Sequence, residues 1–230
     1  MLSQESFEMP RVAAPNEPHL ACVLLLDTSG SMHGEPIKSL NQALSDFKNK
    51  ISMDEMAKKR VDVAIIEFND DANLIQDFTP ISLMGTCMLT AGGLTSMGKG
   101  INMAIDKVKE RNNFYASMGT PAFKPWIFMI TDGAPTDNID LAAKRIREEE
   151  NKGTYGKLKF FALGVPGYEK KSLLDLTYRI LELRDTDFSG IFNWLSESMV
   201  SISVSRVGDE ATLSSLPENA RRADKDVSDW

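Results

Sequence analysis

Seven consecutive apolar residues constrain the fold of this chain more than any other feature. They run from Leu20 to Leu26 and end directly before Asp27. A short run that is apolar at every position is typical of a strand buried on both faces, as found at the centre of a parallel sheet. Parallel strands need long crossover connections, which are usually helices. The run therefore predicts an α/β fold.

The rest of the sequence alternates between strand-like and helix-like segments. Further strands are expected at 61–68, 72–78, 125–131 and 158–165, with a short sixth strand near 178–183. Helices are expected at 35–51, 98–115, 138–150, 171–176 and 191–204. The turn at 69–71 makes the third strand an antiparallel partner of the second. We therefore expect a doubly wound, mostly parallel six-stranded sheet with one antiparallel edge strand and helices on both faces.

Length and composition indicate one domain between two short extensions. The chain has 230 residues, of which 42% are hydrophobic and 26% are charged. These values are typical of a single globular domain. We expect an extended arm over 1–17, the domain over 18–205, and an acidic, flexible tail over 206–230. A partner-anchoring role for Trp230 is the alternative interpretation of the tail.

The charge and the absence of targeting segments limit the classes of partner. The formal net charge is −7, which argues against nucleic acid or an anionic membrane as the main partner. No apolar stretch approaches the roughly 18 residues of a transmembrane helix, and the first residues lack the features of a secretion signal. Cys22 and Cys87 are expected to be reduced thiols. Together these features predict a cytoplasmic protein.

Side chains with oxygen atoms follow two of the predicted strands. Asp27, Ser29 and Ser31 alternate after the first strand, and Asp132 follows the strand at 125–131. A glycine-rich loop between the two motifs contributes Thr95. Carboxylate and hydroxyl oxygens suit Mg²⁺, Mn²⁺ or Ca²⁺ better than zinc or copper. The sequence therefore predicts a divalent-metal site, with ordinary capping of loops and helices as the alternative.

Three motifs resemble, in order, those of a von Willebrand factor A domain with a metal-ion-dependent adhesion site. They are Asp-x-Ser-x-Ser at 27–31, Gly-Gly-x-Thr at 92–95 and Thr-Asp-Gly at 131–133. The resemblance covers residues 18–204. It implies that the metal ligands are Asp27, Ser29, Ser31, Thr95 and Asp132. It also implies a non-catalytic module for protein–protein interaction.

The composition of this ligand set favours a partner that presents a carboxylate. Two of the five side chains carry a formal charge, so a bound ion would remain short of a strong anionic ligand. An Asp or Glu of a partner protein could complete the coordination. Specificity is expected from the surrounding residues, Met32, His33, Met97, Pro135 and Asp137.

A narrower resemblance involves residues 131–137, which are similar to the small bacterial proteins named TerY for tellurite resistance. It implies a bacterial stress or tellurite-response system in which the partner is a kinase or phosphatase. This step rests on family analogy alone.

Two enzymatic alternatives depend on other features. Residues Gly93 to Lys99 nearly match the phosphate-binding loop of nucleotide-binding proteins, but Gly100 replaces the hydroxyl residue that binds Mg²⁺. A metal-dependent hydrolase would need a general base to activate water, and the sequence indicates none. His33 is expected to be a surface loop residue.

Overall fold

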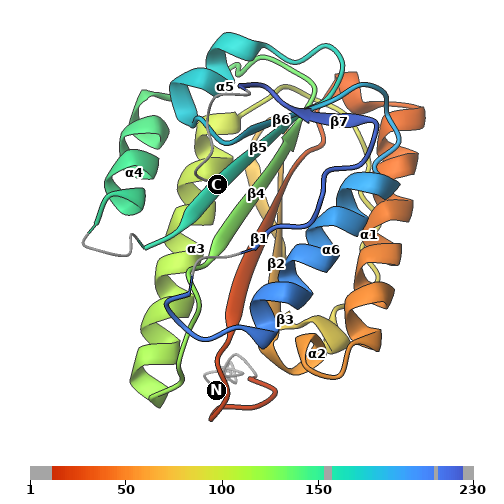
Figure 1. Ribbon diagram of the computed structural model, residues 1–230. Coiled ribbons are helices and arrows are strands. Elements are labelled where there is room, and N and C mark those ends of the chain that lie inside the picture. The colour runs from red at the N-terminus through yellow and green to blue at the C-terminus, as the bar shows by residue number, and fades with distance from the viewer. Residues whose placement is uncertain (1–11, 153–156, 210–211, 225–230) are drawn as a thin grey trace, which may run out of the picture.

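A seven-stranded sheet runs through the middle of the molecule between two layers of helices (Figure 1). The computed structural model describes residues 12–152, 157–209 and 212–224. The strands are β1 Leu20–Asp27, β2 Val61–Phe68, β3 Ala72–Pro80, β4 Trp126–Thr131, β5 Lys159–Gly164, β6 Ile180–Leu183 and β7 Ala220–Arg222. Their order is β3-β2-β1-β4-β5-β6-β7. β3 and β7 are antiparallel to their neighbours, and the other pairs are parallel.

The six strands expected from the sequence are confirmed, including the short sixth strand and the antiparallel edge strand β3. The structure differs by adding β7, which comes from the segment expected to be a flexible tail. β7 pairs with β6, and the Arg221 Nε donates a hydrogen bond of 2.7 Å to the Glu182 carboxylate across this pair. A strand of three residues that includes two arginines carries no apolar periodicity. Its position depends on tertiary contacts.

The expected terminal extensions lie partly outside the described residues. The arm expected at 1–17 is described only from Val12 onward, and Trp230 is not among the described residues. The described part of the tail packs on the domain, since the indole nitrogen of Trp194 donates a hydrogen bond of 2.8 Å to the Ser214 carbonyl oxygen.

Six α-helices within the described residues cover the two faces of the sheet. They are α1 Glu35–Met53, α2 Ala57–Arg60, α3 Met97–Met118, α4 Asp140–Glu150, α5 Lys170–Leu176 and α6 Ser189–Val204. Short 3₁₀ turns occur at Gly30–Met32 and Ile81–Leu83. None of the helices in this part of the chain is both long and apolar enough to cross a membrane.

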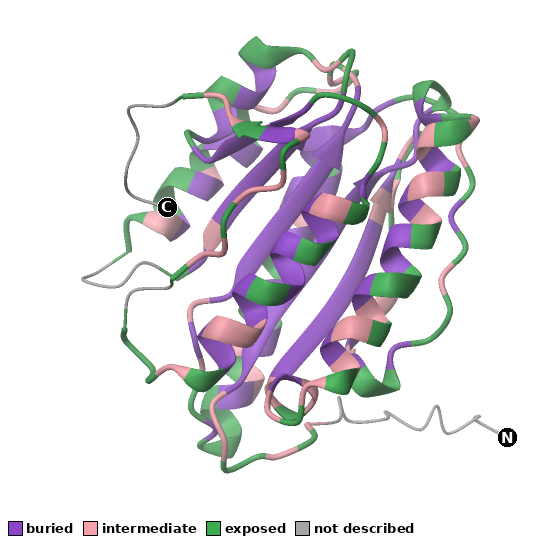
Figure 2. Ribbon diagram, turned by 45° about the vertical axis from the view of Figure 1, so that its right-hand side comes forward, coloured by how far each residue is buried: buried purple, intermediate pink, exposed green. Residues whose placement is uncertain are grey.

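β1 lies in the interior of the sheet between β2 and β4 and is buried along its whole length, and the interior strands are coloured as buried in Figure 2. Successive side chains of a strand point to opposite faces. Leu20, Cys22, Leu24 and Leu26 accordingly pack in the core beneath α1 and α6, whereas Ala21, Val23 and Leu25 pack in the core beneath α3, α4 and α5. This double burial explains why the run is apolar at every position.

The order of the strands places the predicted site at one edge of the sheet. β1 and β4 are neighbours, with β2 and β3 on one side and β5, β6 and β7 on the other. The direction in which the chain adds strands therefore reverses between β1 and β4. In open α/β sheets ligands bind beyond the carboxyl ends of the strands at this point. Asp27 ends β1 and Asp132 directly follows β4.

Candidate metal centre

Asp27 forms the floor of the site and is fully buried. Its Oδ1 accepts a hydrogen bond of 2.8 Å from the backbone N–H of Ser29. Its Oδ2 accepts a hydrogen bond of 2.6 Å from the hydroxyl of Thr131, the last residue of β4. The carboxylate is thus held in one orientation by the loop after β1 and by the neighbouring strand.

Hydroxyl groups connect this loop to the second carboxylate. The Ser29 and Ser31 hydroxyl oxygens lie 3.1 Å apart. The Ser31 hydroxyl donates a hydrogen bond of 2.6 Å to Oδ1 of Asp132. Ser29 is 2% exposed and Asp132 is 9% exposed, whereas Ser31 is an exposed residue. The group is therefore open to a ligand on the Ser31 side.

Thr95 joins the same group from the glycine-rich loop. A side-chain carbon placed at Gly133 would lie 3.5 Å from the Thr95 hydroxyl oxygen and 3.9 Å from the Ser31 hydroxyl oxygen. The loop is held by backbone hydrogen bonds from Gly92 N to Thr28 O and from Gly30 N to Gly93 O. The structure thus brings together all five residues expected from the sequence. We call Asp27, Ser29, Ser31, Thr95 and Asp132 the loop cluster.

Among the residues that the structure describes, no basic side chain compensates the charge of the two carboxylates of the loop cluster. Burial raises the pKa of Asp27, and the negative charge of Asp132 adds to this effect, although hydrogen bonds from Ser29 and Thr131 oppose it. Burial also raises the pKa of Asp132, against the hydrogen bond from Ser31. Within the described residues, neither carboxylate forms an ion pair with a basic side chain.

This donor set fits a divalent cation with oxygen ligands. A cation would supply the missing counter-charge, and hydroxyls and carboxylates are hard donors. In the described part of the chain, no three His, Cys, Asp or Glu residues gather into a metal-binding group. Any metal at the loop cluster would therefore depend on the serine and threonine hydroxyls. The capping alternative is not supported for Ser29, which precedes the 3₁₀ turn but makes no side-chain capping hydrogen bond.

Three residues position the loop cluster through contacts that the sequence did not indicate. Thr131 orients Asp27, as described above. The Thr136 hydroxyl accepts a hydrogen bond of 3.1 Å from the backbone N–H of Thr95. The Asp137 carboxylate accepts hydrogen bonds of 2.9 Å each from the backbone N–H groups of Gly98 and Lys99. These contacts join the loop after β4 to the glycine-rich loop and to the start of α3.

The structure corrects part of the surface expected around the metal. Met32 and Met97 are fully buried in the core and cannot contact a partner directly. They were expected at the surface because they are close to the metal ligands in the sequence. Closeness in sequence does not show in which direction a side chain points. His33 is exposed, as expected. Asp137 fastens the start of α3, so its main contacts are within the protein.

The nucleotide-binding alternative is not supported by the geometry of its loop. A phosphate-binding loop connects a strand to a helix, and its backbone N–H groups bind the phosphates. Residues 84–96 before α3 contain no strand. The N–H groups of Gly98 and Lys99 are bound to Asp137, and Lys99 forms an ion pair of 3.1 Å with Asp71. The groups that would bind a phosphate are therefore engaged within the protein.

Comparison with known proteins decides the family. The model of the von Willebrand factor type A domain matches residues 22–179, which is more than half of the chain and includes the whole loop cluster. The chain belongs to this family. The expected resemblance is thereby confirmed at the level of the family, and VWA denotes the domain below. A comparison with curated proteins finds no match.

Solved structures with the same fold come from diverse sources. A von Willebrand factor type A protein from Catenulispora acidiphila is 14% identical with a TM-score of 0.61, covering 80% of this chain and 43% of that protein. The pilus adhesin SpaC from Lactobacillus rhamnosus GG, in an open conformation, is 12% identical with a TM-score of 0.66. The match covers 81% of this chain and 30% of that protein. At such low identities these similarities show the fold alone.

A third structure is that of proximal thread matrix protein 1 from the mussel byssus, with a zinc-occupied MIDAS motif. It is 15% identical with a TM-score of 0.53, covering 80% of this chain and 48% of that protein. This chain therefore spans less than half the length of each of these three proteins.

Proposed function

We propose that this VWA domain is a non-catalytic protein-binding module that acts through a divalent cation at the loop cluster. Asp27, Ser29, Ser31, Thr95 and Asp132 would hold the ion, for which Mg²⁺ is the first choice and Mn²⁺ or Ca²⁺ the alternatives. When bound, the ion would supply positive charge and a coordination position for a carboxylate of the partner. An Asp or Glu side chain of another protein is thus the expected ligand.

The observation that carries this proposal is the convergence of two uncompensated carboxylates with three hydroxyls at the reversal point of the sheet. The hydroxyls are neutral, so they add little negative charge to the site. The exposed Ser31 marks the side from which a partner could approach. The hydrogen bonds of Asp27 to Ser29 and Thr131 fix the floor before any ligand binds, which limits the ordering required on association.

Membership of a particular biological system is a further part of the proposal. The sequence of residues 131–137 supports a TerY-like role in a bacterial stress or tellurite-resistance system, with a kinase or phosphatase as the partner. A cytoplasmic location is proposed from the composition and from the two free cysteines.

The test is affinity capture from a lysate of the source cells, with the full chain as bait. Capture is performed in Mg²⁺ and in EDTA, with wild type and with Asp27→Asn. A protein retained by wild type in Mg²⁺, and lost both in EDTA and on the Asn variant, is the expected result. Asp46→Asn provides a matched control, because Asp46 is an exposed aspartate on α1. The proposal would be contradicted if no captured protein depended on both Mg²⁺ and Asp27.

A further inference from the structure

A leucine is exposed directly beside the loop cluster. Leu94 precedes Thr95 on the glycine-rich loop and is 59% exposed. Single exposed leucines are common on protein surfaces and by themselves indicate no function. Leu94 differs from such residues because its neighbour in the sequence belongs to the loop cluster. A partner that reaches an ion at the loop cluster therefore comes close to this side chain.

The backbone of Leu94 is fixed from three directions. Its own N–H donates a hydrogen bond of 2.9 Å to the Asp70 carboxylate. The two glycines before it are bound to the loop after β1, as described above. The Thr95 N–H donates a hydrogen bond of 3.1 Å to the Thr136 hydroxyl, and the Thr136 N–H donates one of 2.9 Å to the Thr95 carbonyl oxygen. Leu94 is thus positioned before a partner binds, which limits the entropy lost on association.

The loop after β4 brings further apolar residues to the same side of the loop cluster. Ala134 is exposed and Pro135 is half-buried. Both directly precede Thr136, the residue that is hydrogen-bonded to Thr95. Apolar residues from two loops therefore border the loop cluster where Thr95 lies. We call Leu94, Ala134 and Pro135 the apolar rim.

The charged residues around the apolar rim are acidic. The loops at 69–71, 92–96 and 133–139 contain Asp70, Asp71 and Asp137 and no basic residue. Lys99, in the first turn of α3, forms an ion pair with Asp71. Among the described residues Asp70 forms no ion pair. Like charges repel, so this surface favours apolar side chains of a partner over additional carboxylates.

The charge balance of the loop cluster also favours a single partner carboxylate. The charge of a divalent ion equals in size the combined charge of the Asp27 and Asp132 carboxylates. The occupied site would therefore be neutral before the partner binds and negative once one carboxylate of the partner has bound. A second carboxylate nearby would be repelled by that charge and by Asp70.

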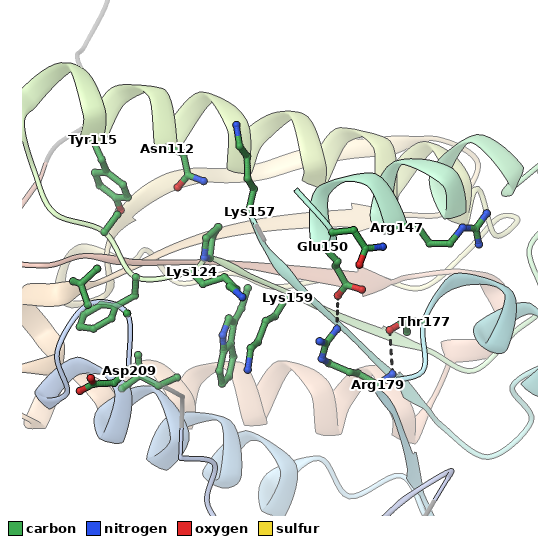
Figure 3. A pocket seen from close by; sticks show the side chains of 18 of the residues that line it. Asn112, Tyr115, Lys124, Arg147, Glu150, Lys157, Lys159, Thr177, Arg179 and Asp209 are labelled. Carbon is green, nitrogen blue, oxygen red and sulfur yellow. Dashed lines mark hydrogen bonds and ion pairs between the residues drawn. The ribbon is translucent and has the colours of Figure 1, made fainter. Parts of the chain in front are cut away.

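The basic residues of the cavity near the start of β4 and β5 do not offer an alternative site for the partner carboxylate (Figure 3). The Arg179 guanidinium donates a hydrogen bond to the Glu150 carboxylate. Burial raises the pKa of Glu150, and the positive charge of Arg179 opposes this effect. The charges of Lys124 and Lys159 act in the same direction as that of Arg179. These cations are therefore engaged with a carboxylate of the chain itself.

We propose that the partner segment recognised by this domain carries one carboxylate with a large apolar side chain close to it in the sequence, and that Leu94 selects for that apolar side chain. The inference rests on the proposed function, since the carboxylate is the one that the ion binds. The apolar side chain packs on Leu94, with Ala134 and Pro135 beside it. Segments with several adjacent acidic residues are disfavoured.

The test uses an array of short immobilised peptides, each with one aspartate in a background of serine and glycine. The positions next to the aspartate are replaced one at a time by leucine or by another aspartate. The full chain, carrying a fluorescent label, is applied in Mg²⁺ and in EDTA. We expect binding that requires Mg²⁺ and the central aspartate. A neighbouring leucine should strengthen this binding by about fivefold, because it buries apolar surface against Leu94, and a neighbouring aspartate should not strengthen it.

Two variants of Leu94 separate its role from that of the ion. Leu94→Ser should lose the preference for a neighbouring leucine and keep the requirement for Mg²⁺ and the central aspartate. Leu94→Lys should instead favour a neighbouring aspartate. The matched control is Leu83→Ser, because Leu83 is 58% exposed and lies in the 3₁₀ turn after β3. The end of β3 pairs with the start of β2, so Leu83 is at the other edge of the sheet and its variant should bind as wild type.

Three results would overturn this inference and leave the proposed function intact. They are Mg²⁺-dependent binding that is equal with leucine and with serine next to the aspartate, binding that strengthens with additional aspartates, and a leucine preference that persists in Leu94→Ser. Absence of Mg²⁺-dependent binding to every peptide would also overturn the inference. The capture experiment described above then decides the proposed function separately.

Discussion

Replacing Asp27 by asparagine should have opposite effects on stability in the absence and in the presence of metal. Asparagine has the shape of aspartate and no charge. Its side-chain oxygen can still accept the hydrogen bond from Ser29 N, and its amide can donate to the Thr131 hydroxyl oxygen. The number of hydrogen bonds is thus preserved, and the change removes mainly the buried charge.

The magnitude follows from two opposing contributions. Each of the two hydrogen bonds to Asp27 loses about 1 kcal/mol when its acceptor becomes neutral. Burial of a carboxylate without a counter-charge costs several kcal/mol, and repulsion from Asp132 adds to that cost. We therefore expect Asp27→Asn to stabilise the metal-free protein by about 1–2 kcal/mol. For a chain of this size that corresponds to an increase in Tm of roughly 2–8 °C.

Bound metal should reverse the relative stabilities of wild type and Asp27→Asn. A ligand present at 100 times its Kd stabilises the folded state by about 2.7 kcal/mol. Wild type should gain this stability in Mg²⁺ and Asp27→Asn should gain little, so wild type becomes the more stable protein. The assay is thermal unfolding followed by circular dichroism in EDTA and in a series of Mg²⁺ concentrations, with Asp46→Asn as the control. A lower Tm for Asp27→Asn in EDTA, or equal Mg²⁺ shifts for both proteins, would refute the reasoning.

Three further predictions concern the supports of the site and the sheet edge. Gly98→Ala places a methyl carbon 2.5 Å from the Asn138 carbonyl oxygen. The substitution should therefore destabilise the protein by about 1–3 kcal/mol and weaken Mg²⁺ binding. A midpoint of urea unfolding equal to that of wild type would contradict this. Thr131→Val removes the donor to Asp27 and should lower the free energy of unfolding by about 1.5–3 kcal/mol at neutral pH, measured by urea titration; no change would show that this hydrogen bond contributes little. Although burial opposes the effect, hydrogen bonds from neighbouring side chains lower the pKa of Glu182 below 4.5. The contribution of Glu182 to stability is therefore complete above pH 4.5 and is lost as the pH falls through the folded pKa. The Tm of Glu182→Gln should therefore depend less on pH in this range than the Tm of wild type. Parallel profiles of Tm against pH for the two proteins would contradict the assignment.

The regular elements could be predicted because their side chains repeat with the period of a helix or strand. The apolar stripe on α1, which includes Ile37, Leu40 and Phe47, is buried as its spacing indicates. β1 is apolar at every position before Asp27 because both of its faces are covered. Asp27, Ser29, Ser31 and Asp132 were predictable because parallel strands end at the same edge of the sheet, whereas Thr95 was predictable only from the resemblance of its glycine-rich loop to the family motif.

The residues that support the site could not be found in this way. Thr131 and Asp137 contact segments more than thirty residues away in the sequence, and no local pattern records such a contact. The burial of Met32 and Met97 likewise depends on how the loops turn above the sheet. β7 owes its conformation to pairing with β6 and not to the apolar content of its own sequence.

The most direct test of a divalent ion at the loop cluster is anomalous diffraction from crystals of the protein grown or soaked with Mn²⁺, recorded near the manganese absorption edge. The account predicts a strong anomalous peak among the side-chain oxygens of Asp27, Ser29, Ser31, Thr95 and Asp132, and no peak there in crystals of Asp27→Asn. Manganese bound elsewhere, with none at the loop cluster in wild type, would contradict the account.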